Sequence, residues 1–243
     1  MRETIIALIG NIKAVLTPIF KNDSPYLPYV IIAAVALLLG IGGINMFIEL
    51  TDELMEGDLV GIDTRVTDYI VSFRTPERTD FFLLLTRIGD IYGYLIIGCI
   101  FILVSAVVFK SWKYIAQISA VLILATLSNM VLKRFIDRAR PDIEHLVSVE
   151  TLSYPSGHAM SAMAFYGFLI YLVYSFKMNF VLKGFVIALL IFLILGIGIS
   201  RIYLGVHFPS DIAGGFIAGF IWVVLCILAF NLFEVFRRDP QTR

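Results

Sequence analysis

Long apolar segments, each about the length of a membrane span, recur along the chain. A helix of about 20 residues rising 1.5 Å per residue crosses a hydrocarbon core of about 30 Å. Because the bilayer interior offers backbone N–H and C=O groups no other partners, spanning segments of this kind are expected to be helical. The pattern therefore predicts an all-α fold, a six-transmembrane-helix bundle. Its spans are residues 28–48, 91–109, 113–132, 158–176, 183–203 and 212–234.

The remaining segments predict elements outside the spans. Residues 1–22 are apolar but contain three basic residues and no small-residue cleavage site, which favours an N-terminal interfacial helix over a signal peptide. Residues 81–88 predict a partial helix at the interface. Residues 49–80 contain nine acidic residues and three arginines, and we expect a long loop there.

Composition agrees with a membrane protein. Apolar residues make up 59% of the 243-residue chain, and charged residues 16%, against about 25% in soluble domains. Lys+Arg and Asp+Glu both total 19, so net charge indicates no nucleic acid or other polyanionic partner. Cys99 and Cys226 lie within apolar runs, which predicts core positions rather than a disulfide or a metal site.

Basic residues in the short connections predict the orientation. Lys110 and Lys113 lie in one connection, and Lys177 and Lys183 in another. With six spans, both connections share a side with the basic residues of the two termini. Since short cytoplasmic loops carry the excess of lysine and arginine, both termini are expected in the cytoplasm. Segments 133–157 and 204–211 then face the opposite side.

Those two segments and the span ends beside them hold the residues that indicate chemistry. Charged side chains at span ends are often only anchors, because charge is costly inside the bilayer. Here, however, three span ends on one side supply complementary groups. The chain has three histidines, and two of them, His158 and His207, belong to these groups. The groups are Lys133, Arg140, Ser156, Gly157, His158, Arg201, His207 and Asp211.

This set of groups suits a phosphate. Lysine and arginine bind phosphoryl oxygens through charge-assisted hydrogen bonds, and Ser156-Gly157 opens a helix whose N-terminus favours an anion. Pro209 opposes a regular helix from His207 to Asp211, so a turn that brings the carboxylate back onto the imidazole is expected. A carboxylate on one ring nitrogen leaves the other free to attack, and His158 can protonate a leaving oxygen.

Two other chemistries fit these residues less well. Ser156 and His158 indicate a serine hydrolase, but a serine two residues from a histidine at a helix start does not readily give nucleophile–base geometry. His158, His207 and Asp211 indicate a metal site, but the three cations would repel a metal ion. We expect no cofactor and no metal. The other polar residues of the segment are expected to be solvated loop groups: Arg134, Asp137, Arg138 and His145.

The order and spacing of these residues resemble the three-part signature of the type 2 phosphatidic acid phosphatase superfamily. The three parts are Lys133-x6-Arg140-Pro141, Pro155-Ser156-Gly157-His158 and Ser200-Arg201-x5-His207-x3-Asp211, separated by 13 and 41 residues. Every signature position is filled. Residues 85–90 resemble a common family element more weakly. The resemblance implies a single integral membrane phosphatase domain over residues 1–243, with the signature-bearing core at about 113–234.

The resemblance also implies roles for the residues. His207 would be the nucleophile of a metal-independent reaction through a phosphohistidine, Asp211 would orient it, and His158 would be the general acid. Lys133, Arg140, Ser156, Gly157 and Arg201 would bind the phosphate. The superfamily includes soluble haloperoxidases, and the six apolar spans argue against that branch.

The substrate is the least determined part of the prediction. An extracytoplasmic site and an acidic loop favour undecaprenyl diphosphate in a bacterial cytoplasmic membrane. Phosphatidylglycerophosphate and phosphatidic acid are the alternatives. The alternative of another class is a lipid transporter or binding protein that keeps the fold without the chemistry. The presence of His158, His207 and Asp211 argues against it. The sequence gives no oligomeric state.

Overall fold

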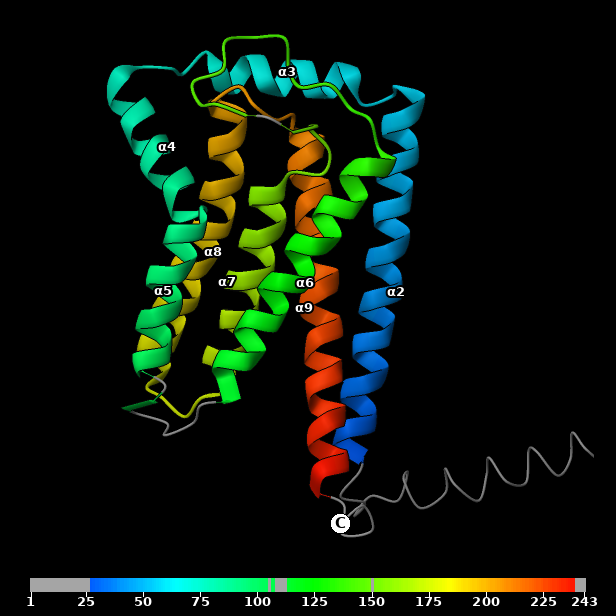
Figure 1. Cartoon of the computed structure of the whole chain (residues 1–243), viewed down its shortest axis with the longest axis vertical. Helices are drawn as coiled ribbons and strands as arrows, with labels where there is room; N and C mark the ends of the chain where they lie inside the picture. The colour runs from blue at the N-terminus through cyan, green and yellow to red at the C-terminus, as the bar shows by residue number, and fades with distance from the viewer. Residues whose placement is uncertain (1–26, 105, 108–112, 150, 239–243) are drawn as a thin grey trace, which may run out of the picture. The chain divides into compact units, whose positions relative to one another are not determined.

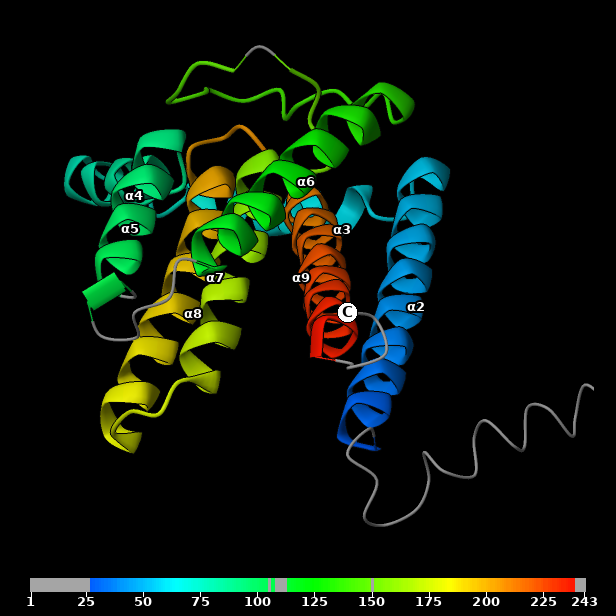
Figure 2. The same ribbon diagram turned by 60° about the horizontal axis from the view of Figure 1, so that its bottom comes forward.

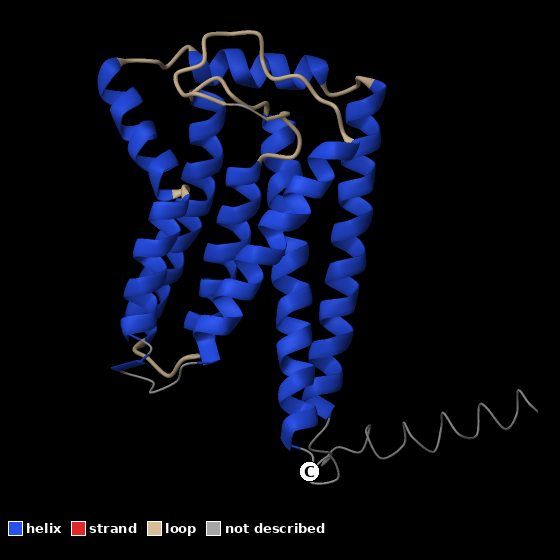
Figure 3. Ribbon diagram, viewed as in Figure 1, coloured by secondary structure: helices blue, strands red, loops and turns tan. Residues whose placement is uncertain are grey.

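The computed structural model describes residues 27–104, 106–107, 113–149 and 151–238. These residues form helices joined by turns and loops, and no strand occurs among them (Figure 3). The predicted all-α fold is confirmed. The helices are α2 (Leu27–Glu56), α3 (Val60–Val71), α4 (Pro76–Ile88), α5 (Ile91–Val104), α6 (Lys113–Phe135), α7 (Gly157–Ser175), α8 (Phe180–Tyr203) and α9 (Pro209–Arg238). The predicted interfacial helix at 1–22 lies outside the described residues.

The predicted spans correspond closely to long apolar helices. Five helices, α2, α6, α7, α8 and α9, are long and apolar enough to cross a membrane. The pair α4 and α5 passes the same test as a broken span that bends by 63° at Gly89-Asp90, which gives up to six spans. The predicted span at 91–109 is thus preceded by a second helical piece. The short interfacial helix expected at 81–88 is the end of that piece.

The predicted loop at 49–80 is wrong. α2 continues to Glu56, α3 follows after a short turn, and α4 begins at Pro76, where Thr75 caps the helix by accepting a hydrogen bond from the Arg78 N–H. The charges of this region exclude a membrane span but not a helix. In α3 the residues that lie inward are Asp63 and Thr67, one helical turn apart, so its buried stripe is polar rather than apolar.

The described chain divides into two compact units. The larger comprises residues 42–223; the smaller comprises residues 1–41 and 224–243, of which the structure describes 27–41 and 224–238. In the smaller unit these two segments lie side by side (Figures 1 and 2). In the larger unit α7 is the most buried helix and packs between α6 and α8. Both cysteines are free; Cys226 is buried as predicted, whereas Cys99 is exposed.

Small residues of α9 allow close approach to α7. A Cβ on Gly215 would lie 2.7 Å from the Ser156 carbonyl oxygen and 2.9 Å from the Ala159 Cβ. One turn further, a Cβ on Gly219 would lie 2.8 Å from the Met163 Cβ. This small-residue spacing, which is common at helix contacts in membranes, therefore forms a contact within the chain. It holds the start of α9 against the start of α7, where two of the signature segments meet.

Gly215→Ala is expected to lower the thermal stability of the purified protein, because the added methyl group meets backbone atoms that cannot move aside. A cost of about 1–3 kcal/mol is typical of such overpacking. Gly184→Ala is the matched control, since a Cβ at this α8 position meets nothing within 4 Å. That change should leave stability unchanged or raise it. Equal melting temperatures for the two variants would contradict the close packing of α9 on α7.

Candidate active site

The signature segments meet at one end of the larger unit. The connection 136–156, the connection 204–208 and helix α3 all lie at this end, and the α7–α8 connection with Lys177 lies at the other (Figures 1 and 2). Gly205 ends α8 with a φ of +81°, a left-handed conformation that glycine adopts without strain. The chain can therefore turn directly from α8 towards His207 and enter α9 at Pro209.

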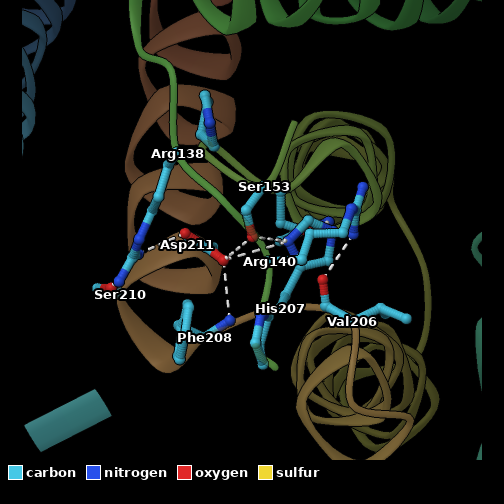
Figure 4. A network of polar contacts seen from close by, with 12 residues as sticks. Arg138, Arg140, Ser153, Val206, His207, Phe208, Ser210 and Asp211 are labelled. Carbon is cyan, nitrogen blue, oxygen red and sulfur yellow. Dashed lines mark hydrogen bonds and ion pairs between the residues drawn. The ribbon is translucent and has the colours of Figure 1, made fainter. Parts of the chain in front are cut away.

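His207 and Asp211 form the buried centre of this end (Figure 4). Nδ1 of His207 lies 3.3 Å from Oδ2 of Asp211, so the predicted turn is confirmed. The same Oδ2 accepts hydrogen bonds from the Ser153 hydroxyl at 2.5 Å and from the Phe208 N–H at 2.8 Å. A carboxylate on Nδ1 favours the tautomer with the proton there, which leaves a lone pair on Nε2.

The surroundings keep His207 neutral. Burial lowers the pKa of His207 to about 3, and the nearby Arg201 and Arg140 act in the same direction against Asp211. Nη1 of Arg140 lies 3.3 Å from Nε2 of His207. The free lone pair thus faces a cationic group. Burial also lowers the pKa of Arg140 itself, and Asp211 opposes that shift.

Lys133 and Arg140 converge on the same short stretch of chain. Lys133 Nζ donates to the Thr151 hydroxyl at 2.9 Å and to the Leu152 carbonyl at 2.7 Å. Arg140 donates through Nε to the Thr151 carbonyl at 2.7 Å and through Nη1 to the Val206 carbonyl at 2.6 Å. These contacts hold both cations near His207 through neutral oxygens, so their charge is not cancelled.

The start of α7 contributes backbone donors. Ser156 caps the helix, its side chain accepting from the Ala159 N–H at 3.5 Å, and its own N–H donates to the Asp211 carbonyl at 3.0 Å. Gly157 is the first residue of the helix, and a Cβ there would lie 3.0 Å from Oδ1 of Asn129. N–H groups in a first helical turn have no partner within the helix, so this end can receive an anion.

Arg201 and His158 each have one strong partner. Nη1 of Arg201 donates to the Thr86 hydroxyl at 2.7 Å, while its buried Nε finds no partner among the described residues. Nε2 of His158 lies 2.7 Å from Oδ1 of Asp90, the residue at the break between α4 and α5. The geometry therefore brings Arg140, His207 and Asp211 into direct contact and leaves His158 on a separate carboxylate.

The expectation that Arg138 is a solvated loop group is wrong. Its Nη1 donates to Oδ1 of Asp211 at 2.5 Å, and its Nη2 to Oδ2 of Asp63 at 2.6 Å. Asp63 is only 2% exposed, which explains why a neighbouring cation is held there. His145 also has a partner, the Pro141 carbonyl, at 2.9 Å from its Nε2. Arg134 and Asp137 are exposed as predicted.

Two pockets open near these side chains. A pocket of about 260 Å³ is lined by residues of α5, α6 and α7 and includes Asp90, Gly157 and His158. A larger one, about 630 Å³, has five basic lining residues and no acidic one; the basic residues are Lys133, Arg134, Arg138, Arg140 and His145. Met130 lines both pockets, so they meet on one turn of α6. Among the described residues, no three His, Cys, Asp or Glu side chains are grouped to hold a metal ion.

A family comparison covers the segments that form this site. The model of the PAP2 superfamily matches residues 114–234, and this range contains all eight predicted site residues. Residues 114–234 of the chain are therefore a PAP2 superfamily domain. Fold and family together define its class, an integral membrane protein of the PAP2 type.

One curated protein and two solved structures are similar to this chain. Phosphatidylglycerophosphatase B of Bacillus subtilis (strain 168) is 42% identical over 103 residues, which are 39% of this chain and 47% of that protein. The match thus spans about half the length of this curated relative. A crystal structure of a transmembrane PAP2-type phosphatidylglycerolphosphate phosphatase from Bacillus subtilis has a TM-score of 0.72 at 27% identity, covering 83% of this chain and 98% of the other. The crystal structure of Aquifex aeolicus LpxE has a TM-score of 0.55 at 26% identity, covering 68% and 94%.

Proposed function

We propose that the protein hydrolyses a lipid phosphate without a metal ion, through a phosphohistidine formed on His207. The observation that carries the proposal is the His207–Asp211 contact with a cation at the other ring nitrogen, since this arrangement prepares a neutral nucleophile beside an anion site. Phosphoryl transfer depends mainly on positioning and on stabilising charge on the equatorial oxygens. Lys133, Arg140 and Arg201 are proposed to supply that stabilisation.

The first proposed step transfers the phosphoryl group to the protein. The lone pair of His207 Nε2 attacks phosphorus, the P–N bond forms, and the bond to the lipid oxygen breaks. His158 gives its proton to that departing oxygen. Asp211 accepts from Nδ1–H and stabilises the positive charge that develops on the imidazole. The donors at the start of α7 and the three cations hold the equatorial oxygens.

The second proposed step releases inorganic phosphate. A water molecule attacks the phosphohistidine, His158 takes a proton from that water, and the P–N bond breaks to restore His207. Asp90, 2.7 Å from Nε2 of His158, fits a group that stabilises His158 when it carries the proton. The 260 Å³ pocket beside His158 is proposed to hold the part of the lipid that carries the departing oxygen.

We propose phosphatidylglycerophosphate as the substrate. A curated relative and a solved structure carry names that specify this activity, and the cations Lys133, Arg134 and Arg140 at the 630 Å³ pocket suit a head group with two anionic phosphates. Undecaprenyl diphosphate, favoured by the sequence alone, has the same two-phosphate character and is the second candidate. No comparison supports it specifically. Phosphatidic acid has a single phosphate and is expected to be a poorer substrate.

The proposed topology follows from the positive-inside rule. With both termini in the cytoplasm, the site lies at the extracytoplasmic face of a bacterial cytoplasmic membrane. Cysteine accessibility tests this proposal. A cysteine in place of exposed Asp137, near the site, should react with a membrane-impermeant reagent in intact cells, and one in place of Lys177 should not. The reverse labelling would place the site on the cytoplasmic face.

Phosphate release by the detergent-purified protein is expected to survive excess EDTA. In the proposed mechanism protein cations provide the charge stabilisation that a metal ion gives other phosphatases. The measurement compares phosphatidylglycerophosphate, undecaprenyl diphosphate and phosphatidic acid side by side, with and without chelator. Loss of activity that added Mg²⁺ or Mn²⁺ restores would contradict the metal-independent mechanism.

The same assay separates the candidate functions. Preference for phosphatidylglycerophosphate supports the proposed substrate, and preference for undecaprenyl diphosphate replaces it with the second candidate. If folded protein releases phosphate from none of the three but moves lipid between the leaflets of vesicles, the protein is a transporter and the hydrolytic proposal fails.

A further inference from the structure

Arg138 joins two acidic side chains from helices that are far apart in the sequence. Its Nη1 donates to Oδ1 of Asp211 at 2.5 Å, and its Nη2 donates to Oδ2 of Asp63 at 2.6 Å (Figure 4 shows the Asp211 side). The guanidinium carbon also lies 4.5 Å from the centre of the Phe208 ring. The planar fork of arginine suits two such contacts at once, whereas lysine offers a single point charge.

Asp63 closes a loop of contacts around the start of α9. Its Oδ1 accepts from the Ser210 N–H at 2.9 Å, and its Oδ2 accepts from the Ser210 hydroxyl at 2.5 Å. Arg138 Nη1 donates to that same hydroxyl at 2.7 Å. Asp63 on α3 therefore holds both Arg138 and the residue before Asp211. Burying a carboxylate is costly unless it is paired and hydrogen-bonded, and here both conditions are met.

The two oxygens of Asp211 have separate tasks. Oδ2 receives Ser153, the Phe208 N–H and His207, while Oδ1 receives Arg138. Asp211 is fully buried, and without Arg138 its Oδ1 loses its charged partner. The carboxylate would then rotate or bind a proton, and its contact with His207 Nδ1 would weaken.

We propose that Asp63 and Arg138 are positioning residues for the nucleophile: Arg138 bridges Asp63 of α3 to Asp211 and thereby fixes the carboxylate that orients His207. This inference rests on the proposed function, in which His207 attacks phosphorus. Neither residue belongs to the signature that identifies the site. Through Asp63, the polar helix α3 has a direct part in the alignment of the reacting histidine.

The test compares kcat, KM and inhibition by inorganic phosphate in a set of variants. Arg138→Met is expected to lower kcat by about 10²-fold, the size of a misalignment of about 1 Å. KM and the inhibition constant for phosphate should change little, because Lys133, Arg140 and Arg201 remain. Arg138→Lys should recover part of kcat. Arg65→Met, at an exposed position of α3, is the matched control and should behave like the wild type.

A double mutant separates positioning from a purely structural role. Asp63→Asn alone is expected to lower kcat by about 10-fold, since it loosens Arg138. In the Arg138→Met background the same change should have little further effect on kcat, because the bridge is already absent. If α3 were only a structural clamp, the two losses would multiply, the melting temperature would fall with them, and Arg138→Lys would recover nothing.

The outcomes also distinguish this inference from the proposed function. Full activity of Arg138→Met, with His207→Ala inactive, would overturn the positioning role and leave the nucleophile intact. Activity of His207→Ala would instead overturn the proposed function. A rise in KM or in the phosphate inhibition constant equal to the loss in kcat/KM would assign Arg138 to substrate binding and contradict the inference.

Discussion

His207→Ala is expected to lower phosphate release by about 10⁴-fold or more, the size of loss seen when a nucleophile is removed. The reason is chemical: the variant lacks the imidazole lone pair that would form the P–N bond. The protein should still insert and fold. A rate measured with saturating substrate gives this effect directly, because the phosphate-binding cations remain.

Trapping the covalent intermediate tests the same prediction at the level of the bond formed. Wild-type protein quenched during turnover with substrate labelled in the scissile phosphate should carry an acid-labile, base-stable label, and His207→Ala should carry none. Arg65→Ala is the matched control, because Arg65 is an exposed residue of α3 that lines neither pocket and should keep both label and rate. Label retained in His207→Ala, or a rate near that of the wild type, would contradict the assignment of the nucleophile.

The spans could be predicted because hydropathy is a local property of the sequence. About twenty consecutive apolar residues favour the bilayer whatever surrounds them, and five predicted spans overlap α2, α6, α7, α8 and α9. The largest difference is in α2, which continues beyond residue 48 to Glu56. The region 49–80 could not be predicted in this way. The buried residues of α3 are the polar Asp63 and Thr67. Asp63 can be buried because Arg138 and Ser210 pair with it, and these partners are far away in the sequence.

The site shows the same division between local and distant information. His207 and Asp211 are four residues apart, so turn geometry predicts their contact, and the structure has it. Ser153, Asp63 and Asp90 reach the site from positions 58, 147 and 68 residues from their partners. No spacing rule connects such residues. Arg138 lies within a signature segment but looked like one more basic residue beside a span end.

Arg201 is a buried cation with an unpaired donor, an arrangement that lowers stability and suits an anion. The side chain is buried, its Nη1 donates to the Thr86 hydroxyl at 2.7 Å, and its Nε has no hydrogen-bond partner among the described residues. A buried donor left unpaired costs about 1–3 kcal/mol, and more when it is charged. A phosphoryl oxygen bound at Nε would remove that cost. We therefore expect the charge of Arg201 to contribute to phosphate binding rather than to folding.

Arg201→Met is therefore expected to have opposite effects on activity and stability. kcat/KM should fall by about 10²–10³-fold, the usual loss of about 3–4 kcal/mol when one preorganised donor to a developing oxyanion is removed. The melting temperature of the phosphate-free protein should stay the same or rise, because a buried cation with an unpaired Nε has become an apolar side chain of similar length. Arg78→Met, at an exposed position of α4, is the control and should change neither quantity.

Inorganic phosphate provides the second measurement. A ligand that binds only the folded state raises its stability by an amount set by concentration and affinity, so phosphate should raise the melting temperature of the wild type. The rise should be much smaller in Arg201→Met. If the variant instead melts well below the wild type and phosphate raises both equally, Arg201 is a structural cation. The unpaired Nε would then have no part in phosphate binding, and the stabilisation of the reacting phosphoryl group would rest on Lys133 and Arg140.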